Sequence, residues 1–159
     1  GDRVLVNKFI YGIRNPFTNN VLVETGLPKR FDVVIFRYPV EPNVDYVKRV
    51  IGLPGEKIQI IRGKIFINDQ PIDDTHGHFG NPYLTGSARD FGPQIVPDES
   101  YFMMGDNRDF SNDSRFWGTV HLKFLRGKAW RLYWSWDASG DDRNYFQRFR
   151  KDRFWMKIE

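Results

Sequence analysis

The residues best suited to chemistry gather in one segment, MMGDNRDFSNDSRFWG at residues 103–118. Aspartates, arginines and serines stand there between large apolar residues, with YFMM where the segment begins and FWG where it ends. Apolar residues at both ends place the segment near a core, where a charged group is costly unless it has a partner of opposite charge. The pattern therefore favours paired charges close to a site over an ordinary solvated loop, which is the usual meaning of such a charged run.

A calcium site is one alternative, because an EF-hand loop also starts from an aspartate and places oxygen ligands at alternating positions. Counted from Asp106, the third position is Arg108, and the sixth is Ser111 where the sharp turn needs glycine. The twelfth position is Trp117 instead of a bidentate glutamate. The spacing therefore argues against an EF-hand site.

A second segment, DYVKRVIGLPGE at residues 45–56, places two cations inside an apolar run. If it forms a strand, alternate side chains face opposite sides, so Lys48 shares a face with Tyr46 and Val50 while Arg49 points to the other face. A single lysine in a strand usually points to solvent or protects a sheet edge. Taken together with the first segment, Lys48 becomes a candidate for the site.

The chain opens on GDRVLVNKFIY, continues with FDVVIFRYP and DYVKRVIGLPGE, and later contains MMGDNRDFSNDSRFWG. These blocks, in this order and with a hairpin after the DYVKRVIGLPGE block, closely resemble the bacterial type I signal peptidases. They cover most of residues 1–67 and 100–137. The match is specific, because YVKRVIGLPG and the GDNR block are long and irregular.

The resemblance implies a membrane-anchored serine endopeptidase with a mostly β fold, which removes signal peptides from exported proteins through a Ser–Lys dyad. Lys48 matches the family's general base, and Ser111 matches the serine that orients the base. The supporting charged positions of the family are matched by Arg49, Asp106, Asp113 and Arg115.

A lysine can take a proton from a serine hydroxyl only while its amine is neutral. Free lysine has a pKa near ~10.4, so useful activity at neutral pH needs a pKa lowered by roughly two units, which corresponds to about 3 kcal/mol. Burial lowers this pKa, whereas a carboxylate beside the amine raises it. We therefore expect the aspartates to be paired with arginines. The expected pairs are Asp106 with Arg49 and Asp113 with Arg115.

By the same resemblance, the substrate is an extended peptide with small residues one and three positions before the cut, bound along a strand edge in shallow apolar pockets. The positions that match the pocket lining are Val4, Ile35, Asp45, Tyr46 and Val47. The expected partners are the signal peptides of preproteins and an anionic membrane surface. The expected location is the bacterial cytoplasmic (inner) membrane, with the catalytic domain on its outer face.

The nucleophilic serine of the family lies in a Ser-Met-x-Pro motif just before the Gly-Asp that opens this chain. None of the serines in this chain belongs to such a motif. They include Ser87, Ser100, Ser111, Ser114 and Ser135. We expect that the chain was cut from a longer one. We also expect that alone it has no peptidase activity, because a base without a nucleophile cannot form an acyl-enzyme.

Two further alternatives keep the signal-peptidase chemistry in part. A self-cleaving repressor-type protease domain shares the Ser–Lys dyad on a related fold, but the GLPGE turn and the GDNR block favour the signal peptidase. A catalytically inactive truncation that binds signal sequences follows from the missing Ser-Met-x-Pro motif, if the truncation is natural.

The elements that must position these residues are mostly strands. Seven runs rich in β-branched and aromatic residues predict them. They lie at residues 3–11, 32–38, 45–51, 57–61, 64–67, 100–104 and 128–134. Between the runs 57–61 and 64–67 stand only Arg62 and Gly63, which predicts a tight hairpin. The predicted fold class is mostly β, a signal-peptidase-like core of antiparallel sheets.

Residues 68–98 are dense in glycine, proline, aspartate and asparagine and show little periodicity. We interpret this segment as a short irregular insertion, a reduced second domain. The catalytic β core then comprises residues 1–67 and 99–159.

Composition excludes several other classes of site. The chain has no cysteine, so disulfides, thiolate chemistry and cysteine-based zinc sites are impossible. His76, His78 and His121 are too few and too scattered for a typical zinc site, and we expect neither a metal nor a cofactor. A nucleic-acid-binding module is another alternative. It is suggested by the net charge of +4 and by the basic, aromatic run RFRKDRFW at residues 148–155. The run has no recognised stacking motif, and we expect no nucleic acid partner.

Overall fold

The structure is a computed structural model. It describes residues 2–8, 10–11, 13–14, 21–23, 26–80, 89–135 and 156–158. The chain divides into two compact units, one of residues 1–27 with 127–159 and one of residues 28–126. Lys48 and Ser111 both belong to the second unit.

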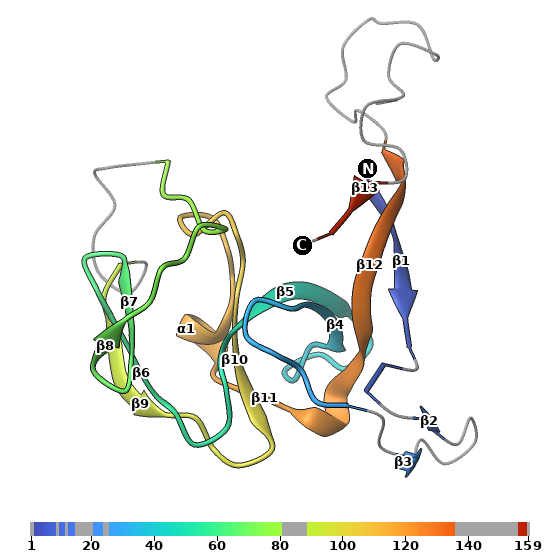
Figure 1. Cartoon of the computed structure of the whole chain (residues 1–159), viewed down its shortest axis with the longest axis horizontal. Helices are drawn as coiled ribbons and strands as arrows, with labels where there is room; N and C mark the ends of the chain where they lie inside the picture. The colour runs from blue at the N-terminus through green and yellow to red at the C-terminus, as the bar shows by residue number, and fades with distance from the viewer. Residues whose placement is uncertain are drawn as a thin grey trace, which may run out of the picture. The chain divides into compact units, whose positions relative to one another are not determined.

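The first unit is built around an antiparallel strand pair (Figure 1). Strand β1 (Asp2–Asn7) pairs with β12 (Leu125–Ser135), and β13 (Met156–Lys157) also pairs with β12. A separate two-stranded sheet is formed by β2 (Ile13–Arg14) and β3 (Val21–Val23). The strand predicted at residues 3–11 was too long. The last register pair of β1 and β12 joins Asn7 to Lys128. Gly127, the next residue of β12 in that direction, lies so close to the Asn7 carbonyl that a side chain at Gly127 would collide with it.

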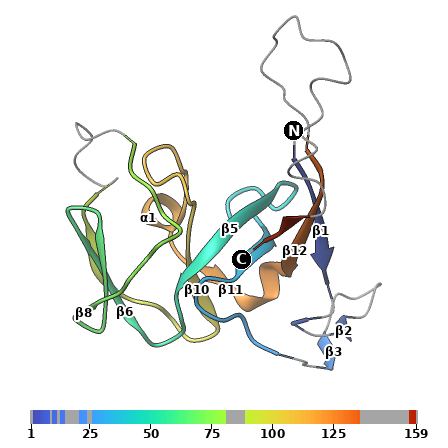
Figure 2. The ribbon, with the colours of Figure 1, turned by 45° about the horizontal axis from the view of Figure 1, so that its top comes forward.

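The second unit contains two antiparallel sheets (Figures 1 and 2). Neighbouring strands of the first sheet are, in order, β4 (Val33–Arg37), β5 (Asp45–Gly52), β10 (Ser100–Met104) and β11 (Val120–His121). Between β10 and β11 the chain forms the short helix α1 (Ser114–Trp117), and a 3-10 turn (Leu122–Phe124) follows β11. Helix α1 packs beside β10, so the segment 103–118 turns back toward the sheet it leaves.

Tight turns join the first three strands of the second sheet in chain order. In order across the sheet they are β8 (Gln70–Pro71), β7 (Lys64–Ile67), β6 (Lys57–Ile61) and β9 (Phe91–Ile95). Arg62 and Gly63 join β6 to β7 with φ angles of 50° and 81°. Two successive positive φ angles are the geometry of a type I′ hairpin turn, so the predicted hairpin is confirmed.

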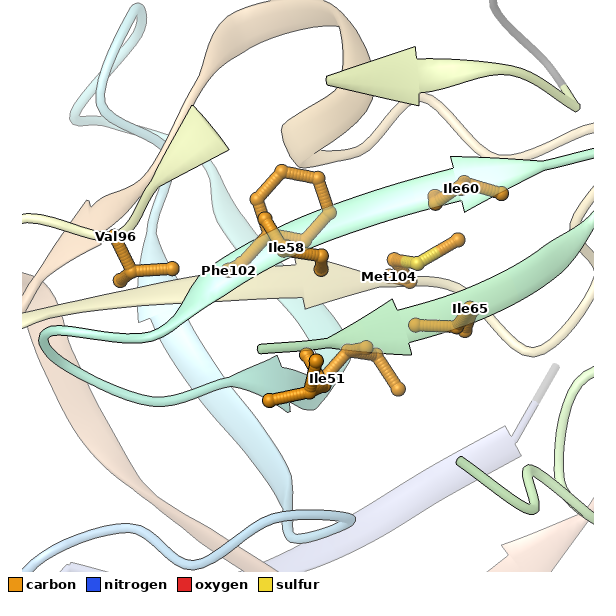
Figure 3. Packing of buried hydrophobic residues seen from close by; sticks show 8 residues of the cluster. Ile51, Ile58, Ile60, Ile65, Val96, Phe102 and Met104 are labelled. Atoms are coloured by element: carbon orange, nitrogen blue, oxygen red, sulfur yellow. The ribbon is translucent and has the colours of Figure 1, made fainter. Parts of the chain in front are cut away.

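Alternation along β5, β6, β7 and β10 sends apolar side chains into the core between the two sheets (Figure 3). Its members, all at most 6% exposed, are Ile51, Ile58, Ile60, Ile65, Ile67, Val96, Phe102 and Met104. Burial of each such side chain contributes roughly 1.5–3 kcal/mol. Met104 belongs to this core and Gly105 follows it, so the core fixes the point at which the charged segment leaves β10.

The GLPGE turn after β5 is closed by an ion pair. The Arg30 guanidinium donates to both carboxylate oxygens of Glu56, at 3.0 Å and 2.5 Å. Glu56 also accepts a hydrogen bond from the Leu53 backbone N–H at 2.7 Å, and Arg30 donates to the Ile51 carbonyl at 2.6 Å. These bonds hold the end of β5, the strand that carries Lys48.

The prediction of a mostly β fold made of antiparallel sheets is confirmed. Strand β9 was not predicted, because it lies inside the irregular segment 68–98 and contains Pro93. Proline is tolerated in an edge strand, and β9 is the edge of its sheet. The division into a core and an insertion at residues 68–98 stays a prediction, and within that segment β8 and β9 pair with β7 and β6.

No helix among the described residues is long and apolar enough to cross a bilayer. The basic run at residues 148–155 lies outside the described part of the chain.

Candidate active site

Lys48 and Ser111 meet although 63 residues separate them in the sequence. Lys48 lies in the middle of β5, and Ser111 lies in the loop between β10 and α1. The Lys48 Nζ is 2.8 Å from the Ser111 Oγ. The Tyr46 ring, on the same face of β5, has its centroid 5.6 Å from the amine. A lysine amine is thus bonded to a hydroxyl beside an aromatic side chain.

Gly105 provides the space in which this pair sits. A Cβ atom at this position would overlap the Ser111 hydroxyl and would lie 2.7 Å from the Ser111 Cβ and 3.3 Å from the Lys48 Nζ. The glycine is needed for this close approach. Gly105 was not among the predicted site residues, although a glycine directly after a buried strand and before a charged run is a signal that could have identified it.

Arg49 lies on the opposite face of β5 from Lys48 and is 5% exposed. Its Nε and Nη2 donate to the two carboxylate oxygens of Asp106, both at 2.8 Å, in a bidentate pair. Its Nη1 donates to the Phe31 carbonyl at 2.8 Å. The pair therefore ties the beginning of the charged segment to β5 and neutralises a buried cation.

Asp113 and Arg115 form a second pair, and both side chains are almost fully buried. Arg115 donates from Nε and Nη2 to the two carboxylate oxygens of Asp113, at 2.8 Å and 2.9 Å. Asp113 is also the N-cap of α1 and accepts a hydrogen bond from the Gly105 N–H at 3.1 Å. Both ion pairs suggested by the sequence are present. Asp113 also links its own pair to the Gly105 backbone.

Ser114 is a second residue that the sequence analysis missed. It is 1% exposed, and its Oγ accepts a hydrogen bond from the Met103 N–H at 2.9 Å. The register between β10 and β5 shifts between Phe102 and Met103, which leaves a backbone donor for a side chain to satisfy. Ser114 therefore stabilises the irregular end of β10.

The electrostatic surroundings favour the neutral form of the Lys48 amine. Burial, the largest influence, lowers the pKa of Lys48 below its ordinary value. Asp113 raises this pKa, Arg115 lowers it and Asp106 raises it. Because each of these carboxylates is shared with an arginine, their attraction for the ammonium form is offset and desolvation prevails.

We expect the Lys48 amine to titrate at a lower pH than a solvent-exposed lysine. The measurement is a pH titration of the 13Cε resonances of isotopically labelled lysine in the 159-residue chain. One resonance should have a lowered midpoint, and it should be missing from the spectrum of the Lys48→Ala variant. A Lys48 resonance with the midpoint of free lysine would contradict the lowered pKa.

The predicted substrate residues are distributed over both faces of β5 and over both units. Tyr46 shares the face of Lys48, whereas Val47 is on the other face, opposite Ile35 in the register of β4 and β5. Asp45 is exposed and forms an ion pair with Arg126 at 3.8 Å. Val4 lies on β1 in the first unit. Their role in substrate binding stays a prediction.

The histidines considered as zinc ligands have other neighbours. The His76 ring packs against Phe31 with the centroids 5.3 Å apart, and the His121 Nδ1 accepts the Lys123 N–H at 3.1 Å. His78 pairs through its backbone with the segment around Asn107. Within the described ranges, no three histidine, aspartate or glutamate side chains are grouped as ligands for a metal.

The sequence model of the family described as "Signal peptidase, peptidase S26" matches residues 1–134. The chain belongs to the signal peptidase family. Lys48 and Ser111 both fall inside the matched region, as do the two ion pairs.

Signal peptidase I sequences from several bacteria resemble the chain. It is 38% identical to signal peptidase I of Pseudomonas fluorescens over 170 residues, which covers 86% of this chain and 60% of that protein. It is 34% identical to signal peptidase I of Leptolyngbya laminosa, with 88% of this chain and 64% of that protein covered. The chain thus spans less than two thirds of the length of these relatives.

The fold also resembles a solved signal peptidase. The crystal structure of a signal peptidase I from Enterococcus faecalis V583 matches with a TM-score of 0.54 and 28% sequence identity. The match covers 65% of this chain and 97% of the Enterococcus chain. The prediction of a signal-peptidase-like β fold is therefore confirmed.

Proposed function

We propose that this chain is the catalytic part of a membrane-associated serine endopeptidase that removes N-terminal signal peptides from exported preproteins. Lys48 is the general base of a Ser–Lys dyad, and Ser111 orients the base. The observation that carries this proposal is the 2.8 Å contact between the Lys48 Nζ and the Ser111 Oγ, made where burial lowers the pKa of Lys48. The family membership supports a serine endopeptidase of this class.

The chemistry follows from a neutral amine held in one orientation. The amine of Lys48 accepts the proton of the nucleophilic hydroxyl while the hydroxyl oxygen bonds to the scissile carbonyl carbon. The ammonium group then returns a proton to the leaving amine, and water hydrolyses the resulting acyl-enzyme. Ser111 holds the amine in place without the negative charge that would keep it protonated. Asp106 and Asp113, paired with Arg49 and Arg115, hold the loop that carries Ser111.

The nucleophile of this mechanism is proposed to lie in a Ser-Met-x-Pro segment placed ahead of Gly1. The test compares the 159-residue chain with an extended enzyme, which is the same chain lengthened through such a segment. The substrate is a preprotein with alanine one and three positions before the cut. The extended enzyme should cleave it at that site, and the 159-residue chain should not.

Two results would contradict the proposal. Specific cleavage by the 159-residue chain would mean that another residue is the nucleophile. An extended enzyme that is folded, judged by its circular dichroism and thermal unfolding, yet inactive on every preprotein tested would remove the assigned activity. The rate of the extended enzyme should also rise with pH, because only the neutral Lys48 amine accepts a proton, with a midpoint below that of free lysine.

We also propose that the domain docks on the outer face of the bacterial cytoplasmic membrane, where its substrates arrive. The Trp117 ring packs against the rings of Phe36 and Tyr38, with centroids 5.9 Å and 5.6 Å apart. In the charged segment at residues 103–118, the aromatic residues Phe110 and Phe116 are exposed, at 77% and 55%. Exposed aromatic residues together with a net charge of +4 suit an anionic lipid surface.

Docking is tested by co-sedimentation of the chain with vesicles that contain anionic lipid, at low and high salt. Binding should weaken as salt rises but should not vanish, because an apolar contribution remains. The double variant Phe110→Ser with Phe116→Ser should lose the salt-resistant part. Ile95→Ser, which changes another exposed apolar side chain, is the matched control. Absence of binding at both salt concentrations would contradict membrane docking by this domain.

A further inference from the structure

Among the described residues, Arg108 is the largest side chain that is fully buried, at 1% exposed. Its guanidinium forms an ion pair with Asp74, whose side chain is 8% exposed. Asp74 lies in the segment that follows β8, more than thirty positions earlier in the chain. A buried ion pair between segments so far apart specifies one arrangement of the two, because breaking it leaves a buried charge without a partner.

The backbone reinforces this contact. The His78 N–H donates to the Asp106 carbonyl at 2.9 Å, and the Arg108 N–H donates to the His78 carbonyl at 3.0 Å. Gly77 lies directly against the guanidinium, since a Cβ atom there would overlap its Cζ and stand 2.6 Å from its Nε. The Asp74 Oδ1 is itself held by the N–H groups of His76 and Gly77, each at 3.3 Å. The segment around Asp74 therefore fits one orientation of the Arg108 side chain.

Arg108 passes this constraint to the site. Its Nε donates to the Gly105 carbonyl at 3.0 Å, while the Gly105 N–H donates to Asp113 at 3.1 Å. Both polar groups of the Gly105 backbone are thus fixed. The Cα of the same residue bounds the space in which Ser111 meets Lys48.

We propose, on the basis of the function proposed above, that Asp74 is a positioning residue of the peptidase. It acts through Arg108 to fix the Gly105 backbone, and this keeps Ser111 and the Lys48 amine in bonding geometry. Asp74 touches neither of these two side chains directly. Asp74, in a segment that looked irregular in the sequence, then helps to position the catalytic pair.

The first experiment measures kcat and KM of the extended enzyme carrying Asp74→Asn. Because misplacement of reacting groups by about 1 Å costs on the order of a hundredfold, we expect kcat to fall by about tenfold to a hundredfold. KM should stay within about twofold, since the proposal gives Asp74 no contact with the substrate. Asp74→Glu should recover part of the loss by restoring the carboxylate. Gly77→Ala should cause a similar loss, because it displaces the guanidinium without changing any charge.

The matched control is Asp69→Asn, which removes the carboxylate of an exposed ion pair with Lys57 in the neighbouring turn and should leave kcat unchanged. Rates are compared at a temperature where thermal unfolding shows every variant to be folded. A kcat for Asp74→Asn equal to that of the parent, or a loss that only follows the folded fraction, would overturn the proposal. If Lys48→Ala is as active as the parent, the proposed function fails rather than the role of Asp74.

A second readout does not need activity. The Lys48 titration described above is repeated on the 159-residue chain with Asp74→Asn. Removal of a negative charge alone would lower the pKa of Lys48, whereas a loosened loop admits water to the amine and raises it. This variant leaves the other titratable, charged and hydrogen-bonding groups near the amine unchanged, namely Tyr46, Asp106, Ser111, Asp113 and Arg115. A rise in the titration midpoint supports the positioning role, and an unchanged or lowered midpoint contradicts it.

Discussion

Replacement of Lys48 by arginine should reduce cleavage by the extended enzyme to the background rate. Arginine keeps the positive charge and much of the length of lysine, but a guanidinium does not lose its proton at any pH at which the protein is folded. It cannot accept the proton of a serine hydroxyl. The expected fall in kcat is about 10²–10⁴-fold, the usual contribution of a positioned general base. Lys48→Ala should be equally inactive.

The assay is hydrolysis of a preprotein or a short peptide that contains the cleavage site, with kcat and KM measured separately. Circular dichroism and thermal unfolding show whether each variant is folded. Lys57→Arg, a change of the same kind at the partly exposed end of β6, is the matched control and should retain the parental rate. Near-parental turnover by the Lys48→Arg variant would remove lysine from the mechanism. Ser111→Ala should have a smaller or comparable effect, depending on how far packing alone orients the amine.

Replacement of Gly105 by alanine should have the second largest effect. The added methyl group would overlap the Ser111 hydroxyl and approach the Lys48 Nζ to 3.3 Å, so one of these side chains must move. A displacement of about 1 Å at reacting groups costs on the order of a hundredfold in rate. We therefore expect kcat to fall by about a hundredfold. KM should change little, because the methyl group enters the space between the base and its orienting hydroxyl.

The control for this variant is Gly80→Ala, since a Cβ atom at Gly80 meets none of the described residues within 4 Å. Its rate should equal that of the parent. The Gly105→Ala variant should also unfold at a lower temperature, because overpacking a filled site costs about 1–3 kcal/mol. Parental kcat in the Gly105→Ala variant would show that the loop yields without disturbing Ser111 and Lys48, and would contradict the tight packing described here.

The two ion pairs explain how a lysine can have a lowered pKa close to two aspartates. Asp106 is bound in bidentate fashion by Arg49, and Asp113 by Arg115, so neither carboxylate is free to bond with the Lys48 amine. What remains beside the amine is a hydroxyl, an aromatic ring and the backbone of Gly105. Desolvation then dominates, and it disfavours the charged form of the lysine.

Several features of the fold were predictable because they are encoded by neighbouring residues. Alternation along KIQII and KIFI marks β6 and β7, and Arg62-Gly63 closes the turn between them in a conformation that glycine makes easy. Strand β9 was not predictable in this way. Pro93 interrupts its pattern, and the strand exists because β6 offers it an edge to pair with.

The sequence by itself determined the strands that carry the site, the hairpin and the types of group that could form a base and its supporting charges. The family resemblance pointed to Ser111 as the partner of Lys48, but only the tertiary structure decided how its hydroxyl reaches the amine. Ser111 and Ser114 lie three positions apart in the same segment, yet Ser111 bonds the amine and Ser114 bonds the Met103 N–H. The physical reason is that local periodicity is set by neighbours in the chain. The direction of a loop side chain is set by distant partners, here by Arg49 on β5 and by Asp74 beyond β8.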